Sequence, residues 1–135
     1  MAGHEPTRVA IDRDADVITA RHKGREMAQR VGFVGSDLTI IATAISEIAR
    51  NIVVYAERGE VVLSPIERAG RRGLQMVARD SGPGIPDIEQ AMRDGFSTGK
   101  SLGLGLPGAR RLMDEFEITS AVGTGTTVVM RKWVR

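Results

Sequence analysis

The segment SDLTIIATAISEIARNIVVY, residues 36–55, carries a broad apolar stripe at helical spacing. This pattern predicts one long helix from Ser36 to Tyr55 that packs against a core. Ser36 is expected to cap the helix, and Asp37 lies favourably at its positive end. Glu47 and Asn51 are four residues apart, so they share one helix face. A carboxylate and an amide beside an apolar stripe indicate the wall of a pocket.

The flanking sequence predicts a second layer made of strands. Two hairpins are indicated by apolar runs joined by polar or glycine-rich turns. We expect two or three helices on one face of a mixed, largely antiparallel sheet of four or five strands, a two-layer α/β sandwich. The expected strands are 7–11, 61–63, 74–78, 117–122 and 126–134, and the further expected helices are 14–30, 87–93 and 106–116.

Composition places the chain among ordinary globular domains. Its 135 residues are 41% apolar and 27% charged, and they show no repeat or linker, so residues 1–135 are expected to form one domain. The absence of cysteine excludes disulfides and thiolate metal sites. With no signal peptide and no run of 18 apolar residues, a cytoplasmic protein without a membrane partner is expected. The scattered net charge of +2 is weak evidence for nucleic acid and suits a nucleotide equally well.

Two phosphate-binding patterns are incomplete. Gly99-Lys100-Ser101 lacks the earlier glycine of a P-loop, because Asp94 stands at that position. Residues 103–108, GLGLPG, match G-x-G-x-x-G but follow a glycine-rich loop instead of a strand, and no carboxylate lies near residues 123–128. A glycine-rich loop that leads into a helix nevertheless makes a good anion site.

The last expected strand is apolar on both faces. Val128, Val129, Met130 and Trp133 cannot all point into one core, because neighbours on a strand face opposite ways. Some apolar surface is therefore expected on the face opposite the helices, for a partner or for the N-terminal segment.

Four motifs resemble those of the GHKL ATP-binding superfamily, in that family's order and at suitable spacings. Glu47-Ile48-Ala49-Arg50-Asn51 resembles its N box, and Asp80-Ser81-Gly82-Pro83-Gly84-Ile85 its first glycine box. Gly103-Leu104-Gly105-Leu106 resembles the second glycine box, and Gly123-Thr124-Gly125-Thr126 the third. The resemblance covers roughly residues 36–129 and implies the Bergerat ATP-binding fold with ATP and Mg²⁺ as ligands.

The resemblance implies a role for each residue of the N box and of the strand-end turn. Asn51 is implied to hold Mg²⁺ through its side-chain oxygen, or alternatively to cap the C-terminal end of the helix. Glu47 is implied to be the general base, or alternatively half of a buried ion pair with an arginine. Asp80 is implied to accept a hydrogen bond from the adenine amino group, or else to be an ordinary turn aspartate. Thr126 is implied to place its hydroxyl near adenine, or to be an ordinary strand threonine.

The glycine boxes are implied to surround the rest of the nucleotide. Gly82 and Gly84 would allow close approach to the base and sugar. In the second box, residues Gly103, Leu104 and Gly105 are implied to bind ATP, with the glycine amides on the phosphates. Lys100 is either a point charge on the phosphates or a solvated loop lysine.

Further stretches resemble a narrower group, the serine/threonine switch kinases of the bacterial stressosome. These stretches are residues 44–51, 94–98 and 106–116 and the Lys132-Trp133 ending, whereas Gly99-Lys100-Ser101 departs from the expected small residues. The likeness implies a kinase that phosphorylates STAS-domain proteins and, once released, activates a PP2C-type phosphatase by binding. The alternatives are an anti-sigma factor kinase that binds a sigma factor, and a nucleotide-dependent binding module without important chemistry.

Overall fold

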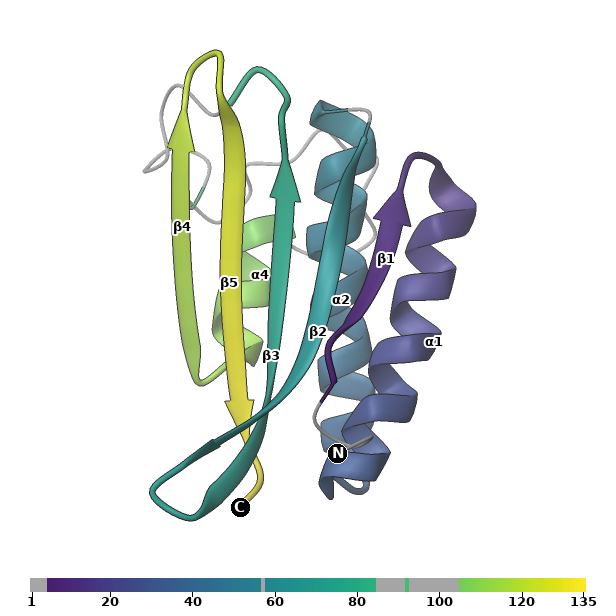
Figure 1. Ribbon diagram of the computed structural model, residues 1–135, viewed down its shortest axis with the longest axis vertical. Helices are drawn as coiled ribbons and strands as arrows, with labels where there is room; N and C mark the ends of the chain where they lie inside the picture. Colours follow the sequence, from purple (N-terminus) through teal and green to yellow (C-terminus); the bar gives the residue numbers. More distant parts are fainter. Residues whose placement is uncertain (1–4, 57, 85–91, 93–104) are drawn as a thin grey trace.

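The computed structural model of this protein describes residues 5–56, 58–84, 92 and 105–135. Within these residues the chain forms a single five-stranded sheet with the strand order β1-β2-β3-β5-β4, in which every pairing is antiparallel. The helices lie on one face of this sheet (Figure 1). The elements are β1 Thr7–Ile11, α1 Asp14–Val31, α2 Ser36–Tyr55, β2 Gly59–Arg68, β3 Arg71–Asp80, α4 Gly105–Leu112, β4 Glu115–Ala121 and β5 Gly125–Trp133. The predicted two-layer α/β sandwich is confirmed.

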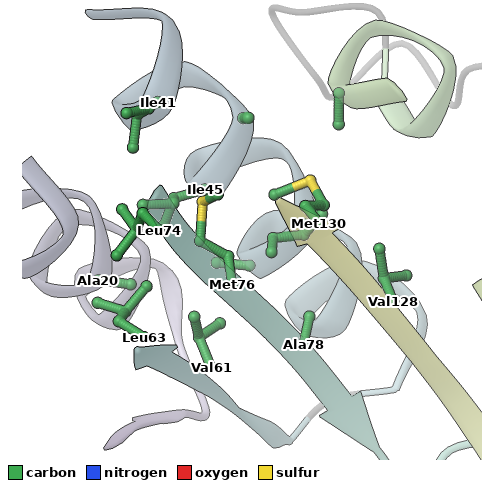
Figure 2. Packing of buried hydrophobic residues seen from close by; sticks show 14 of the residues in the cluster. Ala20, Ile41, Ile45, Val61, Leu63, Leu74, Met76, Ala78, Val128 and Met130 are labelled. Carbon is green, nitrogen blue, oxygen red and sulfur yellow. The ribbon is translucent and has the colours of Figure 1, made fainter. Parts of the chain in front are cut away.

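The core lies between α2 and the central strands. Ile41 and Ile45 of α2, Met76 of β3 and Met130 of β5 are fully buried in one apolar cluster, and Leu63 of β2 lies on the side toward Ala20 of α1 (Figure 2). The layer is almost entirely aliphatic. Burial of a side chain of this size contributes about 1.5–3 kcal/mol to folding, so the apolar stripe of α2 helps to hold the helical layer on the sheet.

By length and composition alone, α2 is apolar enough to cross a membrane. More than half of it is buried inside the domain, and Glu47 lies within the buried part. Its apolarity therefore has a structural explanation as the core helix of this sandwich.

Two details differ from the sequence predictions, and a third prediction falls on residues that the structure does not describe. The N-terminal cap position of α2 is Gly35, and Ser36 is already helical and makes no side-chain capping hydrogen bond. The β2–β3 turn is tighter than expected, because β2 extends to Arg68 and only Ala69 and Gly70, both with positive φ, separate the strands. Residues 87–91 and 93 of the expected short helix lie outside the described residues.

The helix expected at residues 106–116 is also too long. α4 ends at Leu112, and Phe116 belongs to β4. The buried Lys132 ammonium donates to the Leu112 carbonyl at 3.4 Å, and the Asp114 amide donates to the Arg131 carbonyl at 3.0 Å. These contacts draw the chain away from the helix axis toward β5, a tertiary effect that periodicity does not report.

The face of the sheet opposite the helices carries a polar network at the end of β5. Val128 and Met130 are buried in the core, so Trp133 points to the opposite face, where it is nevertheless buried. The Arg68 guanidinium lies 4.7 Å from the centroid of its ring, and the indole N–H donates to Glu115. Hydrogen bonds from Arg68 and then Trp133 lower the pKa of Glu115 to about 2. Trp133 therefore does not supply the exposed apolar surface that the sequence suggested.

Candidate functional site

The predicted site residues of the first and third glycine boxes come together at one end of the sheet. β3 ends there at Asp80, opposite Gly59 of β2, and the turn between β4 and β5 lies beside it (Figure 1). The Gly123 amide in this turn donates to the Pro83 carbonyl at 2.9 Å. The C-terminal end of α2 approaches from the helical layer, because Ala56 lies against Gly82. Three parts of the chain that are distant in sequence thus form one wall: the α2–β2 junction, the end of β3 and the β4–β5 turn.

One of the two carboxylate oxygens of Asp80 joins the end of β3 to neighbouring segments through hydrogen bonds. Oδ1 accepts hydrogen bonds from the backbone amides of Gly82 at 2.9 Å and Thr126 at 3.2 Å. The Gly82 bond is the contact that an ordinary turn aspartate makes. The Thr126 bond goes further, because it ties β3 to the start of β5. Among the described residues Oδ2 has no hydrogen-bond partner, so it is the oxygen available to a ligand.

Two glycines let the backbones of these segments approach each other. Gly125 has a φ of +111°, and a Cβ atom there would collide with the carbonyl oxygen of Asp80. Gly84 has a φ of +81°, and a Cβ atom there would collide with the carbonyl oxygen of Ala121. At Gly82 a Cβ atom would lie only 2.6 Å from that of Ala56. The structure thus gives Gly82 and Gly84 a packing reason to be glycine, and their predicted approach to a base and sugar stays a prediction.

Glu47 is the most deeply buried polar residue of the N box, with 5% of its surface exposed. Its Oε2 accepts a hydrogen bond from the Gly105 amide at the start of α4, at 3.2 Å. Its Oε1 lies 3.6 Å from Nη1 of Arg50, so the ion pair considered as an alternative role is present but long. The Gly105 contact means that α2 offers a carboxylate to the amide end of α4, where an anion is favoured.

Asn51 follows Glu47 by one turn on the same face of α2 and is partly buried. The helix continues to Tyr55, and the Ala56 amide makes the terminal bond to Ile52, so the capping role considered for Asn51 is wrong. Among the described residues its side chain makes no hydrogen bond. An amide oxygen with this freedom fits Mg²⁺, which prefers hard oxygen ligands and keeps several waters.

The described residues do not form a metal site made of protein carboxylates alone. Within the described residues, no group of three His, Cys, Asp or Glu side chains is placed to hold a metal. Nucleotide phosphates and water are oxygen donors of the kind that could complete the coordination of a metal held by Asn51.

The Thr126 hydroxyl has a partner that the sequence analysis missed. Thr126 is 5% exposed, and its Oγ1 lies 2.8 Å from Oγ of Ser120 across the β4–β5 hairpin. The Ser120 hydroxyl also donates to the Gly125 carbonyl at 3.2 Å. The register of a short hairpin around Gly123-Thr124-Gly125 would have placed Ser120 opposite Thr126.

The second glycine box is described only in part. Gly105 is the first residue of α4 and contacts Glu47, whereas Lys100, Gly103 and Leu104 lie outside the described residues. Their predicted contacts with phosphate stay predictions.

Comparison with known proteins shows the family of this chain. Residues 11–132 match the family model of the histidine kinase-like ATPase domain. The chain is similar to the serine/threonine-protein kinase RsbT of Bacillus subtilis (strain 168), with 48% identity over 94% of this chain and 96% of that protein. It is also similar to the anti-sigma F factor of Geobacillus kaustophilus (strain HTA426), with 35% identity over 73% of this chain and 70% of that protein.

Solved structures with a similar fold are histidine kinase domains. The catalytic domain of the histidine kinase ThkA aligns with a TM-score of 0.54 at 16% identity, over 96% of this chain and 95% of that one. A histidine kinase domain from Erythrobacter litoralis EL346 aligns with a TM-score of 0.52 at 20% identity, over 88% of this chain and 59% of that one. At these identities the likeness concerns the fold alone.

Proposed function

Because this chain belongs to the histidine kinase-like ATPase domain family, we propose that it is a serine/threonine protein kinase of a bacterial partner-switching pathway. Family membership confirms the predicted ATP-binding domain of kinase type. The observation that carries the narrower proposal is the pairing of Glu47 with Asn51 on one face of α2, in a chain 48% identical to RsbT over nearly its whole length.

We assign the nucleotide a position along that face. The adenine amino group donates to Oδ2 of Asp80, the oxygen that the fold leaves available. The phosphates extend toward the Gly105 amide at the start of α4, where the helix dipole favours negative charge. Asn51 would hold Mg²⁺ together with phosphate oxygens, and the bound metal would neutralise charge that develops during transfer. Guanine presents a carbonyl in place of the amino group and is disfavoured opposite a carboxylate.

The transfer step needs a base for the acceptor hydroxyl. Oγ of the acceptor serine or threonine forms a bond to the γ-phosphorus while the bond from that phosphorus to the β–γ bridging oxygen breaks, and ADP leaves. The hydroxyl proton goes to the Glu47 carboxylate, which lies one helical turn from Asn51. Because Glu47 is buried, it has few water molecules to compete with the acceptor hydroxyl.

The proposed acceptors are STAS-domain scaffold and antagonist proteins. A phosphorylated serine carries about −1.5 to −2 charge at neutral pH. In the pocket that charge faces both the nucleotide phosphates and Glu47, so repulsion favours release of the product. The released kinase then engages the regulatory domain of a PP2C-type phosphatase in the cytoplasm and activates it by binding.

The test is transfer of labelled γ-phosphate from ATP to a purified STAS-domain protein, followed by co-purification. The unphosphorylated acceptor should be retained in the presence of a non-hydrolysable ATP analogue, and a phosphomimetic acceptor should be lost. Equal retention of both forms would refute the partner switch even if transfer were observed.

A second candidate function is supported by the 35% identity to an anti-sigma F factor. In that case the chain binds a sigma factor directly and phosphorylates an antagonist of that complex. A third candidate is a module whose binding depends on nucleotide but that performs no significant transfer. Pull-downs with ATP or ADP against a sigma factor, a STAS-domain protein and a PP2C-type phosphatase separate the three, because each predicts a different retained partner.

A further inference from the structure

We propose that Ser120 is a specificity-determining residue, because it makes the Thr126 hydroxyl an acceptor and not a donor toward the base. The base pocket then accepts a 6-amino purine and rejects a 6-oxo purine. The inference rests on the proposed function, because it assumes that the base lies beside Asp80. Ser120 belongs to none of the four motifs and contacts the base only through Thr126, so its role is that of a positioning residue.

The direction of the hydrogen bonds follows from counting hydrogens. A serine or threonine hydroxyl has one hydrogen to donate and two lone pairs. The Gly125 carbonyl can only accept, so the Ser120 hydrogen points to it, across 3.2 Å. The 2.8 Å contact between the two hydroxyl oxygens then requires Thr126 to be the donor. The single hydrogen of Thr126 is thus directed to Ser120 and away from the pocket.

The consequence is that the two described side chains assigned to the base, those of Asp80 and Thr126, both offer acceptors. Thr126 lies against Asp80, because its amide donates to Oδ1 of that carboxylate at 3.2 Å. Oδ2 of Asp80 can only accept when ionised, and Oγ1 of Thr126 has only lone pairs left to offer. An exocyclic amino group supplies two hydrogens and suits two acceptors, whereas a carbonyl oxygen at the same position would face lone pairs from both.

Asp80 and Ser120 together discriminate between 6-amino and 6-oxo purines better than Asp80 would alone. A threonine hydroxyl without a fixed partner rotates and donates to whichever acceptor arrives, so it would tolerate a 6-oxo base. The cross-strand register places Ser120 directly opposite Thr126, and the turn between them keeps that register. The pocket discriminates against a 6-oxo purine because the carbonyl oxygen of that base finds no hydrogen-bond donor.

The test compares binding of ATP and ITP, since the two bases differ in the group at carbon 6 and in the protonation of the adjacent nitrogen. Affinities are measured with Mg²⁺ on the full chain, by competition against a fluorescent ATP analogue. In Ser120→Ala the Thr126 hydroxyl no longer donates to Ser120, so it should donate to the 6-oxo group of ITP. ITP affinity should rise about threefold to tenfold, which is the gain expected from one neutral hydrogen bond. ATP affinity should stay within about twofold, because a free hydroxyl still accepts.

Further variants separate this effect from a general disturbance of the hairpin. Ser120→Cys keeps the size of the side chain with a weak donor and acceptor, so its gain in ITP affinity should be intermediate. Thr126→Val removes the hydroxyl, so ATP affinity should fall, and ITP should gain less affinity than in Ser120→Ala because no new donor is created. In the double variant Ser120→Ala/Thr126→Val the ITP gain should vanish, which no general loosening of the hairpin predicts.

Two results would overturn the inference, and they differ in what they imply. If the wild type prefers ATP and neither Ser120 variant gains ITP affinity, Ser120 does not set the polarity, although the proposed function survives. If the wild type binds ATP and ITP equally, the position of the base beside Asp80 is itself wrong.

Discussion

Glu47→Gln distinguishes a catalytic base from a structural ion pair. The substitution keeps the size of a side chain that is 95% buried and retains an oxygen to accept from the Gly105 amide. It removes the charge and the capacity to take a proton. Loss of a general base lowers phosphoryl transfer by about 10²–10⁴-fold. ATP binding should be retained or tightened, because a negative charge near the phosphates is removed.

The effect on stability can be bounded from the contacts. The hydrogen bond from Gly105 changes from a charged acceptor, about 1.5–3 kcal/mol, to a neutral one, about 0.5–1.5 kcal/mol. Against this loss stands the cost of burying a carboxylate, which is several kcal/mol after relaxation. The ion pair to Arg50 offsets little of that cost, because it is 3.6 Å long and 28% of the Arg50 side chain is exposed. We therefore expect the free energy of unfolding to fall by no more than about 1.5 kcal/mol, and to rise where relief of the burial cost exceeds the weaker hydrogen bond.

The assay pairs urea unfolding of the nucleotide-free chain with transfer of labelled phosphate to a STAS-domain protein. Glu26→Gln on α1 is the matched control, because it makes the same chemical change at an exposed position and should alter neither quantity. Loss of about 3–5 kcal/mol is what removal of one partner from a buried ion pair produces. That loss, with transfer at the wild-type rate, would show that Glu47 is structural and that the base lies elsewhere.

Three further predictions concern the pocket and the sheet. Asp80→Asn keeps an oxygen for the amides of Gly82 and Thr126 but places an NH₂ group opposite the adenine amino group. ATP affinity measured by calorimetry should therefore fall about tenfold or more, which corresponds to the loss of one charged hydrogen bond. Equal affinity of the wild type for ATP and GTP would contradict the adenine assignment. Asn51→Ala should abolish the part of ATP affinity that depends on Mg²⁺, so titrations with Mg²⁺ and with EDTA should converge, and a persisting difference would place the metal elsewhere. Because Arg68 and then Trp133 hold the pKa of Glu115 near 2, below its ordinary value of 4.5, the stabilisation from Glu115 is complete above pH 4.5 and is lost as the pH falls toward 2. Glu115→Gln should therefore unfold more easily in urea than wild type at pH 7 but equally at pH 2, and a difference that persists at pH 2 would mean that packing, not charge, is responsible.

Helices and strands could be predicted from the sequence wherever the spacing of apolar residues in a segment matched the side that the fold buries. The stripe of α2 and the apolar runs in β3 and β5 are local patterns, and all three elements form where these patterns predict. Prediction failed at element ends, such as the end of α4, because contacts with Lys132 and Arg131 from a distant strand decide where the helix stops.

By itself, the sequence of this protein determined which chemical groups could act, since the Glu47–Asn51 spacing and the four motifs depend on local order along the chain. Only the tertiary structure decided how these groups are used. Asp80 reserves one oxygen because the amides of Gly82 and Thr126 occupy the other, and Glu47 contacts Gly105, 58 residues further along the chain. Ser120 gains its importance from lying opposite Thr126 across a turn. The physical reason is that a hydrogen bond depends on distance and direction in space, which the chain reaches only after its strands have paired.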